Sequence, residues 1–134
     1  MAEIEIPQTQ GEDGVATINL NSLNADQSAY LEDSGISIAR DQGAIRFCVS
    51  GNPTTGYTWN QKPELAIGAF TVEETYCKDE SPAGFCGVPG TYYFTIRAAA
   101  GSAESLGIFA LWHGRVWEGE ERALEAKAVL IKIV

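Results

Sequence analysis

Apolar residues that recur at every second position constrain this chain more than any other feature. In the clearest stretch, at 91–100, Tyr92, Phe94, Ile96 and Ala98 fall on one face of an extended backbone. Similar stretches, bounded by turn residues, occupy 15–20, 36–39, 45–50, 57–61, 70–76, 106–112 and 129–133. About seven or eight short strands without a long amphipathic helix predict an all-β fold, an immunoglobulin-like β-sandwich.

Two stretches leave the secondary structure open. Residues 27–31 fit a short helical turn or an edge strand, and the ALEAKA segment at 123–128 has helical propensity. Residues 1–14 are polar and acidic, and we expect them to be flexible apart from a candidate strand at Ile4 and Ile6. The sequence therefore predicts a flexible N-terminal segment at 1–14 and a single domain at 15–134.

The formal net charge of −9 excludes several classes of partner. Nucleic-acid binding needs a basic surface, and anionic membranes would repel this chain. The sequence contains no apolar run of about eighteen residues, so we expect no membrane-spanning helix. The N-terminal stretch MAEIEIPQTQ lacks the features of a signal peptide, so we expect either a cytoplasmic protein or a chain that begins after a removed signal.

The cysteine count is odd, which leaves the redox state open. Cys77 and Cys86 flank the stretch KDESPAGF, and they are either bridged across it or both free. Cys48 is expected on the strand face opposite Phe47 and Val49. A bridge would indicate a periplasmic or secreted protein, and free thiols would indicate a cytoplasmic one.

The residues that catalysis requires are scarce. His113 is the only histidine, and we expect it in a surface loop. No cysteine is surrounded by a recognisable nucleophile signature. The cysteine and histidine spacings match no zinc site, and no phosphate-binding motif is present. We therefore expect neither an enzyme nor a metal ion or other cofactor.

The stretch GNPTTGYTW at 51–59 has the composition of a stiff loop between two strands. Pro53 fixes its own φ and restricts Asn52 to extended geometry. Gly56 can adopt a positive φ, which turns the chain back toward Tyr57. The loop is expected to present Thr54 and Thr55 at a preorganised tip, which suits binding because little entropy remains to be lost.

Three glycine-bearing loops, at 51–57, 77–90 and 113–119, are called the first, second and third loop below. In a Greek-key sandwich, loops spaced in this way lie together at one end. Trp117 with Arg115 in the third loop is the pairing expected of an interface anchor. The alternative is that Trp117 packs back onto the core.

All three loops resemble motifs of the chagasin family, protein inhibitors of papain-like cysteine peptidases. The first loop is identical to that family's NPTTGYxW signature in Asn52, Pro53, Thr54, Thr55, Gly56 and Tyr57, followed by Trp59. The second is similar to its GxGG element in Gly87, Val88, Pro89 and Gly90. The third is similar to its RPWE loop in Arg115, Val116, Trp117 and Glu118. Pro89 replaces a glycine of the family pattern, and Val116 replaces its proline.

The resemblance implies reversible, tight-binding, competitive inhibition of papain-like cysteine peptidases. Thr54 would lie nearest the catalytic cysteine, with Thr55 and Gly56 completing the wedge. The second loop, with Gly87 to Gly90, and the third, with Arg115 and Trp117, would contact the two sides of the cleft. The resemblance also implies a strand, not a helix, at 123–128.

A second function class stays open beside the inhibitor. An adhesion or carbohydrate-binding sandwich would use Trp59, Trp112, Trp117 and the tyrosines as stacking platforms, although we expect Trp112 on the core face of its strand. Nothing in the sequence indicates a self-complementary apolar face, so we expect a monomer when the protein is free.

Overall fold

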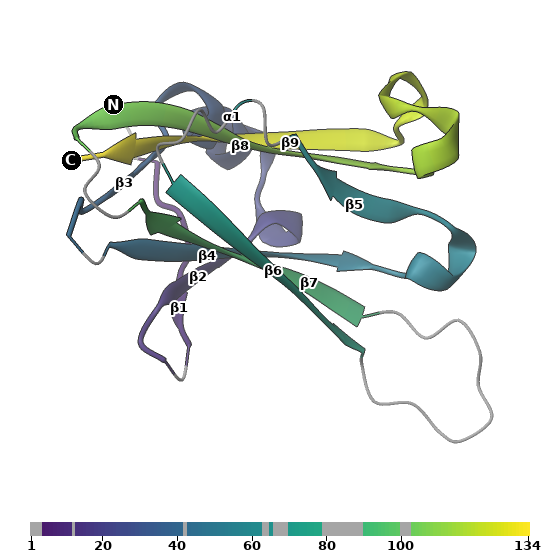
Figure 1. The fold of residues 1–134 in the computed structure, drawn as a ribbon, viewed down its shortest axis with the longest axis horizontal. Coiled ribbons are helices and arrows are strands. Elements are labelled where there is room, and N and C mark those ends of the chain that lie inside the picture. The colour runs from purple at the N-terminus through teal and green to yellow at the C-terminus, as the bar shows by residue number, and fades with distance from the viewer. Residues whose placement is uncertain are drawn as a thin grey trace.

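The computed structural model describes residues 4–11, 13–41, 43–62, 65, 70–78, 90–99 and 103–134. Within them the chain forms two β-sheets that pack face to face, with one α-helix (Figure 1). The helix α1 spans Ala25–Asp33, and the strands are β1 (Thr9–Gln10), β2 (Ala16–Asn19), β3 (Ile36–Ile38), β4 (Ala44–Gly51), β5 (Thr58–Gln61), β6 (Phe70–Lys78), β7 (Gly90–Ala98), β8 (Ser105–Gly114) and β9 (Glu125–Ile133). The predicted β-sandwich is confirmed.

One sheet has five strands in the order β1-β2-β4-β7-β6, and the other has four in the order β3-β9-β8-β5. Most neighbours are antiparallel, but β2 runs parallel to β4 and β3 runs parallel to β9. The ALEAKA segment therefore ends in a strand, as the family resemblance implied, because β9 pairs with β8 from Glu125 onward.

The core lies between the sheets and is built from the predicted alternating residues. Phe47 on β4 and Phe94 on β7 are fully buried, and the ring centroid of each lies 5.4 Å from that of Phe109 on β8. Burying a large apolar side chain of this kind contributes about 1.5–3 kcal/mol. Such a core makes the sandwich a stiff support for the loops at its ends.

The face that β8 turns to the core differs from the expected one. Phe109 and Leu111 are buried, whereas Leu106 is 60% exposed and Trp112 is half-buried on the outer face. The expectation that Trp112 belongs to the core is therefore wrong. Phe109 pairs with the buried Val129 of β9, and residues directly opposite each other share a face, so the pairing decides which residues point inward.

The ambiguous stretch at 27–31 belongs to the nine-residue helix α1. Asn24 and Gln27 form a capping box, in which Asn24 Oδ1 accepts from the Gln27 amide at 2.8 Å and Gln27 Oε1 accepts from the Asn24 amide at 2.9 Å. The helix buries Leu31 and ends at Asp33, and the amide of Gly35 just beyond it donates to the carbonyl of Tyr30. The helix therefore depends on its cap and on one deeply buried residue. With so few buried residues, the sequence at 27–31 shows only a weak helical pattern of apolar residues.

The strand predicted at Ile4 and Ile6 lies instead at Thr9–Gln10, where β1 pairs with β2. Asp13 forms an ion pair with Arg46 of β4 at 2.6 Å, and this contact lowers the pKa of Asp13 to about 2. These contacts attach residues near the N-terminus to the five-stranded sheet. The domain boundary at residue 15 stays a prediction.

Candidate functional site

The first loop begins at the end of β4 and contains a short 3₁₀ turn at Pro53–Thr55. Asn52 Oδ1 accepts from the Thr54 amide at 3.2 Å and from the Thr54 hydroxyl at 2.6 Å. The Asn52 carbonyl accepts from the Thr55 amide at 3.2 Å and from the Thr55 hydroxyl at 2.8 Å. Both threonines are exposed, so the turn places them at the surface while their hydroxyl groups stabilise it.

Gly56 closes this turn with a φ of +87°, the positive value that the sequence predicted. The chain then enters β5, where the indole N–H of Trp59 donates to the carbonyl of Ser50 at 2.9 Å. Trp59 is only 3% exposed. The side of the first loop nearest the core is thus fixed by a buried aromatic residue that connects β5 to the last residues of β4.

The third loop is shorter than predicted, because His113 and Gly114 belong to β8. It continues as a 3₁₀ turn at Val116–Glu118, with the Glu118 amide donating to the carbonyl of Arg115 at 3.0 Å. Trp117 is 73% exposed, so it does not pack back onto the core. A second 3₁₀ turn, Glu120–Arg122, follows it and is held to Lys62 by a 2.7 Å ion pair with Glu120.

The first and third loops are in direct contact at one end of the sandwich. The guanidinium carbon of Arg115 lies 4.4 Å from the centroid of the Tyr57 ring, and Arg115 Nη2 lies 3.5 Å from the carbonyl oxygen of Thr55. In Figure 1 the turn after β4 and the turns after β8 occupy the same end of the molecule. The predicted clustering is confirmed for these two loops.

For the second loop, the described residues show its two ends. Cys77 and Lys78 belong to β6 and Gly90 begins β7, while Gly87, Val88, Pro89 and Cys86 lie outside the described residues. Gly90 pairs with both Lys78 and Gly51, the residue that precedes the first loop. A Cβ atom at Gly90 would collide with the hydroxyl group of Tyr76 and the carbonyl of Cys77, so glycine is required at this position. Cys77 is exposed and free in the structure, so of the two states that the sequence left open, the free thiol is the one observed at Cys77.

His113 supports the site from behind, which the sequence did not reveal. Its ring stacks on Trp59, with 4.6 Å between the ring centroids, because Trp59 and His113 pair directly across β5 and β8. The centroid of the Tyr57 ring lies 6.0 Å from that of His113. Burial lowers the pKa of His113, against a smaller opposing effect of Glu125. The expectation of a surface loop histidine is wrong, and only the strand pairing could have corrected it.

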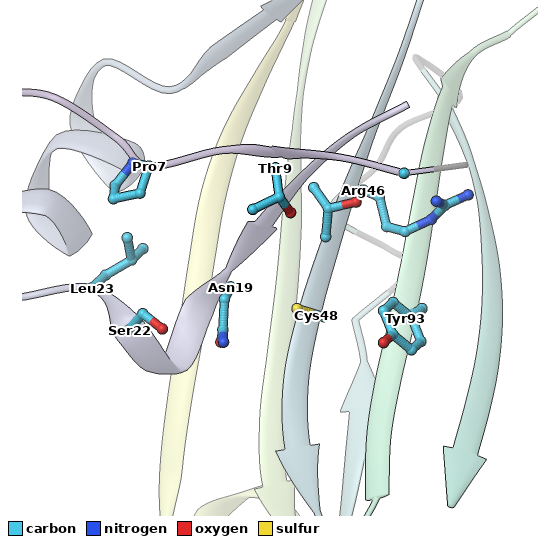
Figure 2. Close-up of a pocket in the computed structure, with 10 residues that line it drawn as sticks. Pro7, Thr9, Asn19, Ser22, Leu23, Arg46, Cys48 and Tyr93 are labelled. Carbon is cyan, nitrogen blue, oxygen red and sulfur yellow. The ribbon is translucent and has the colours of Figure 1, made fainter. Parts of the chain in front are cut away.

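One groove of the described surface is lined by residues outside these loops, and Figure 2 shows it in close-up. It has a volume of about 480 Å³ on the outer face of the five-stranded sheet, and its lining includes Pro7, Thr9, Asn19, Ser22, Leu23, Arg46, Cys48 and Tyr93. Cys48 lies on the face opposite Phe47 and Val49, as expected. None of the residues that line this groove belongs to the three loops.

The described residues contain no group of three or more side chains that could hold a metal ion. No helix in the same part of the chain is long and apolar enough to cross a membrane.

Comparison with known proteins supplies a family for this arrangement. The model of the chagasin family peptidase inhibitor I42 matches residues 42–130, a stretch that contains all three loops. No curated protein sequence matches the chain significantly.

Two solved structures share the fold. The cysteine protease inhibitor EhICP2 from Entamoeba histolytica is 21% identical, with a TM-score of 0.60 over 74% of this chain and 85% of that chain. Amebosin is 20% identical, with a TM-score of 0.56 over 87% of this chain and 93% of that chain. At these identities the similarity concerns the fold, which is the predicted immunoglobulin-like sandwich.

Proposed function

Because the chain belongs to the chagasin family of peptidase inhibitors, we propose that it inhibits papain-like cysteine peptidases reversibly and competitively with its three loops. Family membership makes it an inhibitor and not an enzyme. One observation carries the proposed mechanism: the exposed tip at Thr54 and Thr55 and the exposed Trp117 lie on two loops in direct contact.

The first loop is the part proposed to enter the active-site cleft, with Thr54 nearest the catalytic cysteine. A peptide bond is cleaved only when its carbonyl carbon reaches the nucleophile in attack geometry. The bonds around Thr54 lie in a 3₁₀ turn that Asn52 stabilises through both its side chain and its carbonyl. Opening the turn would break these hydrogen bonds, each worth about 0.5–1.5 kcal/mol, so the loop resists cleavage.

The other two loops are proposed to contact the sides of the cleft. Trp117 supplies a large, rigid aromatic surface that stacks at low entropic cost. The second loop, including Gly87, Val88, Pro89 and Gly90, is proposed to lie on the opposite side. Three loops on one rigid support would bury a contact area of the usual size for a protein complex, about 800 Å² on each partner.

The alternative, an adhesion or carbohydrate-binding module, has less support. It requires a flat row of exposed aromatic rings, but Trp59 is buried and Trp112 is half-buried. Among the three tryptophans only Trp117 is highly exposed. A single exposed ring beside a stiff, exposed tip fits a peptidase cleft better than a sugar surface.

Titration of papain of known active-site concentration tests the proposal. Stoichiometric inhibition that is reversed on dilution, competes with substrate and leaves the inhibitor intact on a gel is the expected result. A correctly folded protein that fails to inhibit papain at micromolar concentration would overturn the proposal for this enzyme. Pro89 and Val116, the two departures from the family pattern, would then be the first residues to revert.

A further inference from the structure

The side chain of Arg115 lies between the first and third loops. Its guanidinium carbon is 4.4 Å from the centroid of the Tyr57 ring and 5.9 Å from that of Trp117. Cation–π contacts of this kind are attractive within about 6 Å, so the Tyr57 contact is the stronger of the two. One charged group thus links an aromatic residue of each loop.

The nitrogen atoms of Arg115 are also directed toward its own chain. Nη2 lies 3.5 Å from the Thr55 carbonyl oxygen, at the long limit of a hydrogen bond, and Nη1 lies 3.6 Å from a carboxylate oxygen of Glu118. Nε is buried beside Gly56 and has no hydrogen-bond partner among the described residues. Contacts on several sides restrict the guanidinium, although the side chain as a whole is 36% exposed.

The contact between Arg115 and Tyr57 rests on a column of rings that reaches the core. The ring centroid of His113 lies 6.0 Å from that of Tyr57 and 4.6 Å from that of the buried Trp59, on which His113 stacks. Trp59 is fixed by its hydrogen bond to the carbonyl of Ser50. Because Tyr57 is held in place from the core, Arg115 packed on Tyr57 is restricted as well, and its contacts can restrict both loops.

From these contacts we infer that Arg115 is a positioning residue, which holds the first loop and Trp117 in one arrangement through Tyr57 and the Thr55 carbonyl. Its charge is directed within the inhibitor and is partly balanced by Glu118. This role also accounts for a departure from the family pattern. Val116 lacks the fixed φ of a proline, and contacts of Arg115 with the first loop provide a constraint in its place. The inference rests on the proposed inhibitory function.

The test compares backbone order in the free inhibitor with inhibition of papain. Order parameters from ¹⁵N relaxation are measured at the Thr54, Thr55 and Gly56 amides of the wild type, Arg115→Gln and Arg122→Gln. Arg122 is exposed in the 3₁₀ turn that follows the third loop, so Arg122→Gln removes an equal charge near the same end of the molecule while its backbone hydrogen bond to Gly119 is kept. We expect Arg115→Gln to lower the three order parameters and raise the inhibition constant about tenfold, the effect of one cation–π contact. We expect Arg122→Gln to change neither.

Two further measurements separate the inference from its alternatives. If Arg115 acts through Tyr57, the effects of Arg115→Gln and Tyr57→Leu on the inhibition constant will be far less than multiplicative in the double variant. Multiplicative effects, or a weaker inhibitor with unchanged order parameters, would assign Arg115 to direct contact with the peptidase and overturn the inference. Lower order parameters with unchanged inhibition would overturn it too.

The same design keeps the inference apart from the proposed function. Failure of the wild type to inhibit papain would reject the proposed function, while unchanged order in Arg115→Gln would reject only the positioning role. If Arg115→Gln does not give a folded spectrum, Arg115→Lys replaces it with the same expectations. Lysine keeps the charge and the aliphatic stem but lacks the planar group that stacks on Tyr57.

Discussion

The indole ring of Trp117 packs against the backbone of Gly56, so closely that a Cβ atom at residue 56 would lie 2.7 Å from Cη2 of the ring. Gly56 also has a φ of +87°, which side chains other than glycine rarely adopt. Two separate requirements therefore select glycine here: the conformation of the turn and the space that Trp117 occupies. The exposed anchor of the third loop is thus positioned by the first loop.

Gly56→Ala is expected to weaken inhibition by displacing Trp117. The backbone strain alone costs about 1–2 kcal/mol, and the contact with the ring must also be relieved. Gly14→Ala is the matched control, since Gly14 has a similar φ of +81° but open space around its Cα. Both variants should lose thermal stability, but only Gly56→Ala should raise the inhibition constant. Equal inhibition by the two variants would contradict the coupling of Trp117 to Gly56.

Trp117→Ala is expected to cost at least about 2 kcal/mol of binding free energy, as an interface hot spot would. This corresponds to a rise of about thirtyfold in the inhibition constant. The melting temperature should hardly change, because Trp117 is 73% exposed and outside the core. Leu124→Ala serves as a control, since Leu124 is also highly exposed but lies beyond the third loop. An unchanged inhibition constant for folded Trp117→Ala would remove Trp117 from the interface.

Thr54→Arg is expected to abolish inhibition, since a long charged side chain at the tip would prevent the first loop from entering the cleft. Thr54 is exposed and its hydroxyl donates only to the neighbouring Asn52, so the free energy of unfolding should fall by about 1 kcal/mol at most. Thr54→Ser keeps the hydroxyl group and should inhibit nearly as well as the wild type. A collapse of thermal stability in Thr54→Arg would indicate that the loop is chiefly structural.

The sequence allowed most of the strands to be predicted, because their apolar residues alternate with a period of two. The turn of the first loop was also predictable, since Pro53 and Gly56 restrict the backbone locally. The inward face of β8 was not, because Ile108 to Trp112 are apolar on both faces. Only the pairing of Phe109 with Val129 selects one of them.

Contacts between the loops could not be predicted from the sequence either, because they too join residues that are distant in the chain. Arg115 and Tyr57 are far apart along the chain, and nothing in either segment alone indicates that they touch. The contact between His113 and Tyr57 could not be predicted either, since it depends on the register of β5 against β8. The motifs thus name the residues of the proposed site, but the contacts between these residues could not be predicted from the motifs.

Cys48 and Cys77 are expected to differ in reactivity. Burial raises the pKa of the Cys48 thiol, so little thiolate forms at neutral pH and access is poor. Under reducing conditions, iodoacetamide should modify the exposed Cys77 quickly and Cys48 only after denaturation. If Cys77 and Cys86 are bridged in solution, protein kept oxidised should take up no label until a reductant is added. Rapid labelling of oxidised native protein at Cys77, read by peptide mass spectrometry, would contradict the bridge.

His113 is expected to make stability depend on pH in the range where a histidine titrates. Burial lowers its pKa below the usual value of 6.5, while Glu125 acts weakly in the opposite direction. The unfolded chain therefore binds the proton more readily, so the stabilising contribution is complete above about pH 6.5 and is lost as the pH falls through the lower folded-state pKa. The melting temperature should decrease between about pH 7 and about pH 5.5, a range above the usual carboxylate pKa values.

His113 is the only histidine in the chain, which makes this range a specific report on one side chain. His113→Phe keeps a ring to stack between Trp59 and Tyr57 but removes the titrating group, so its melting temperature should be nearly constant over the same range. Because Tyr57 contacts both His113 and Arg115, inhibition by the wild type should weaken in parallel as His113 gains a proton. A wild type and a His113→Phe variant with the same pH dependence would exclude His113 as its origin.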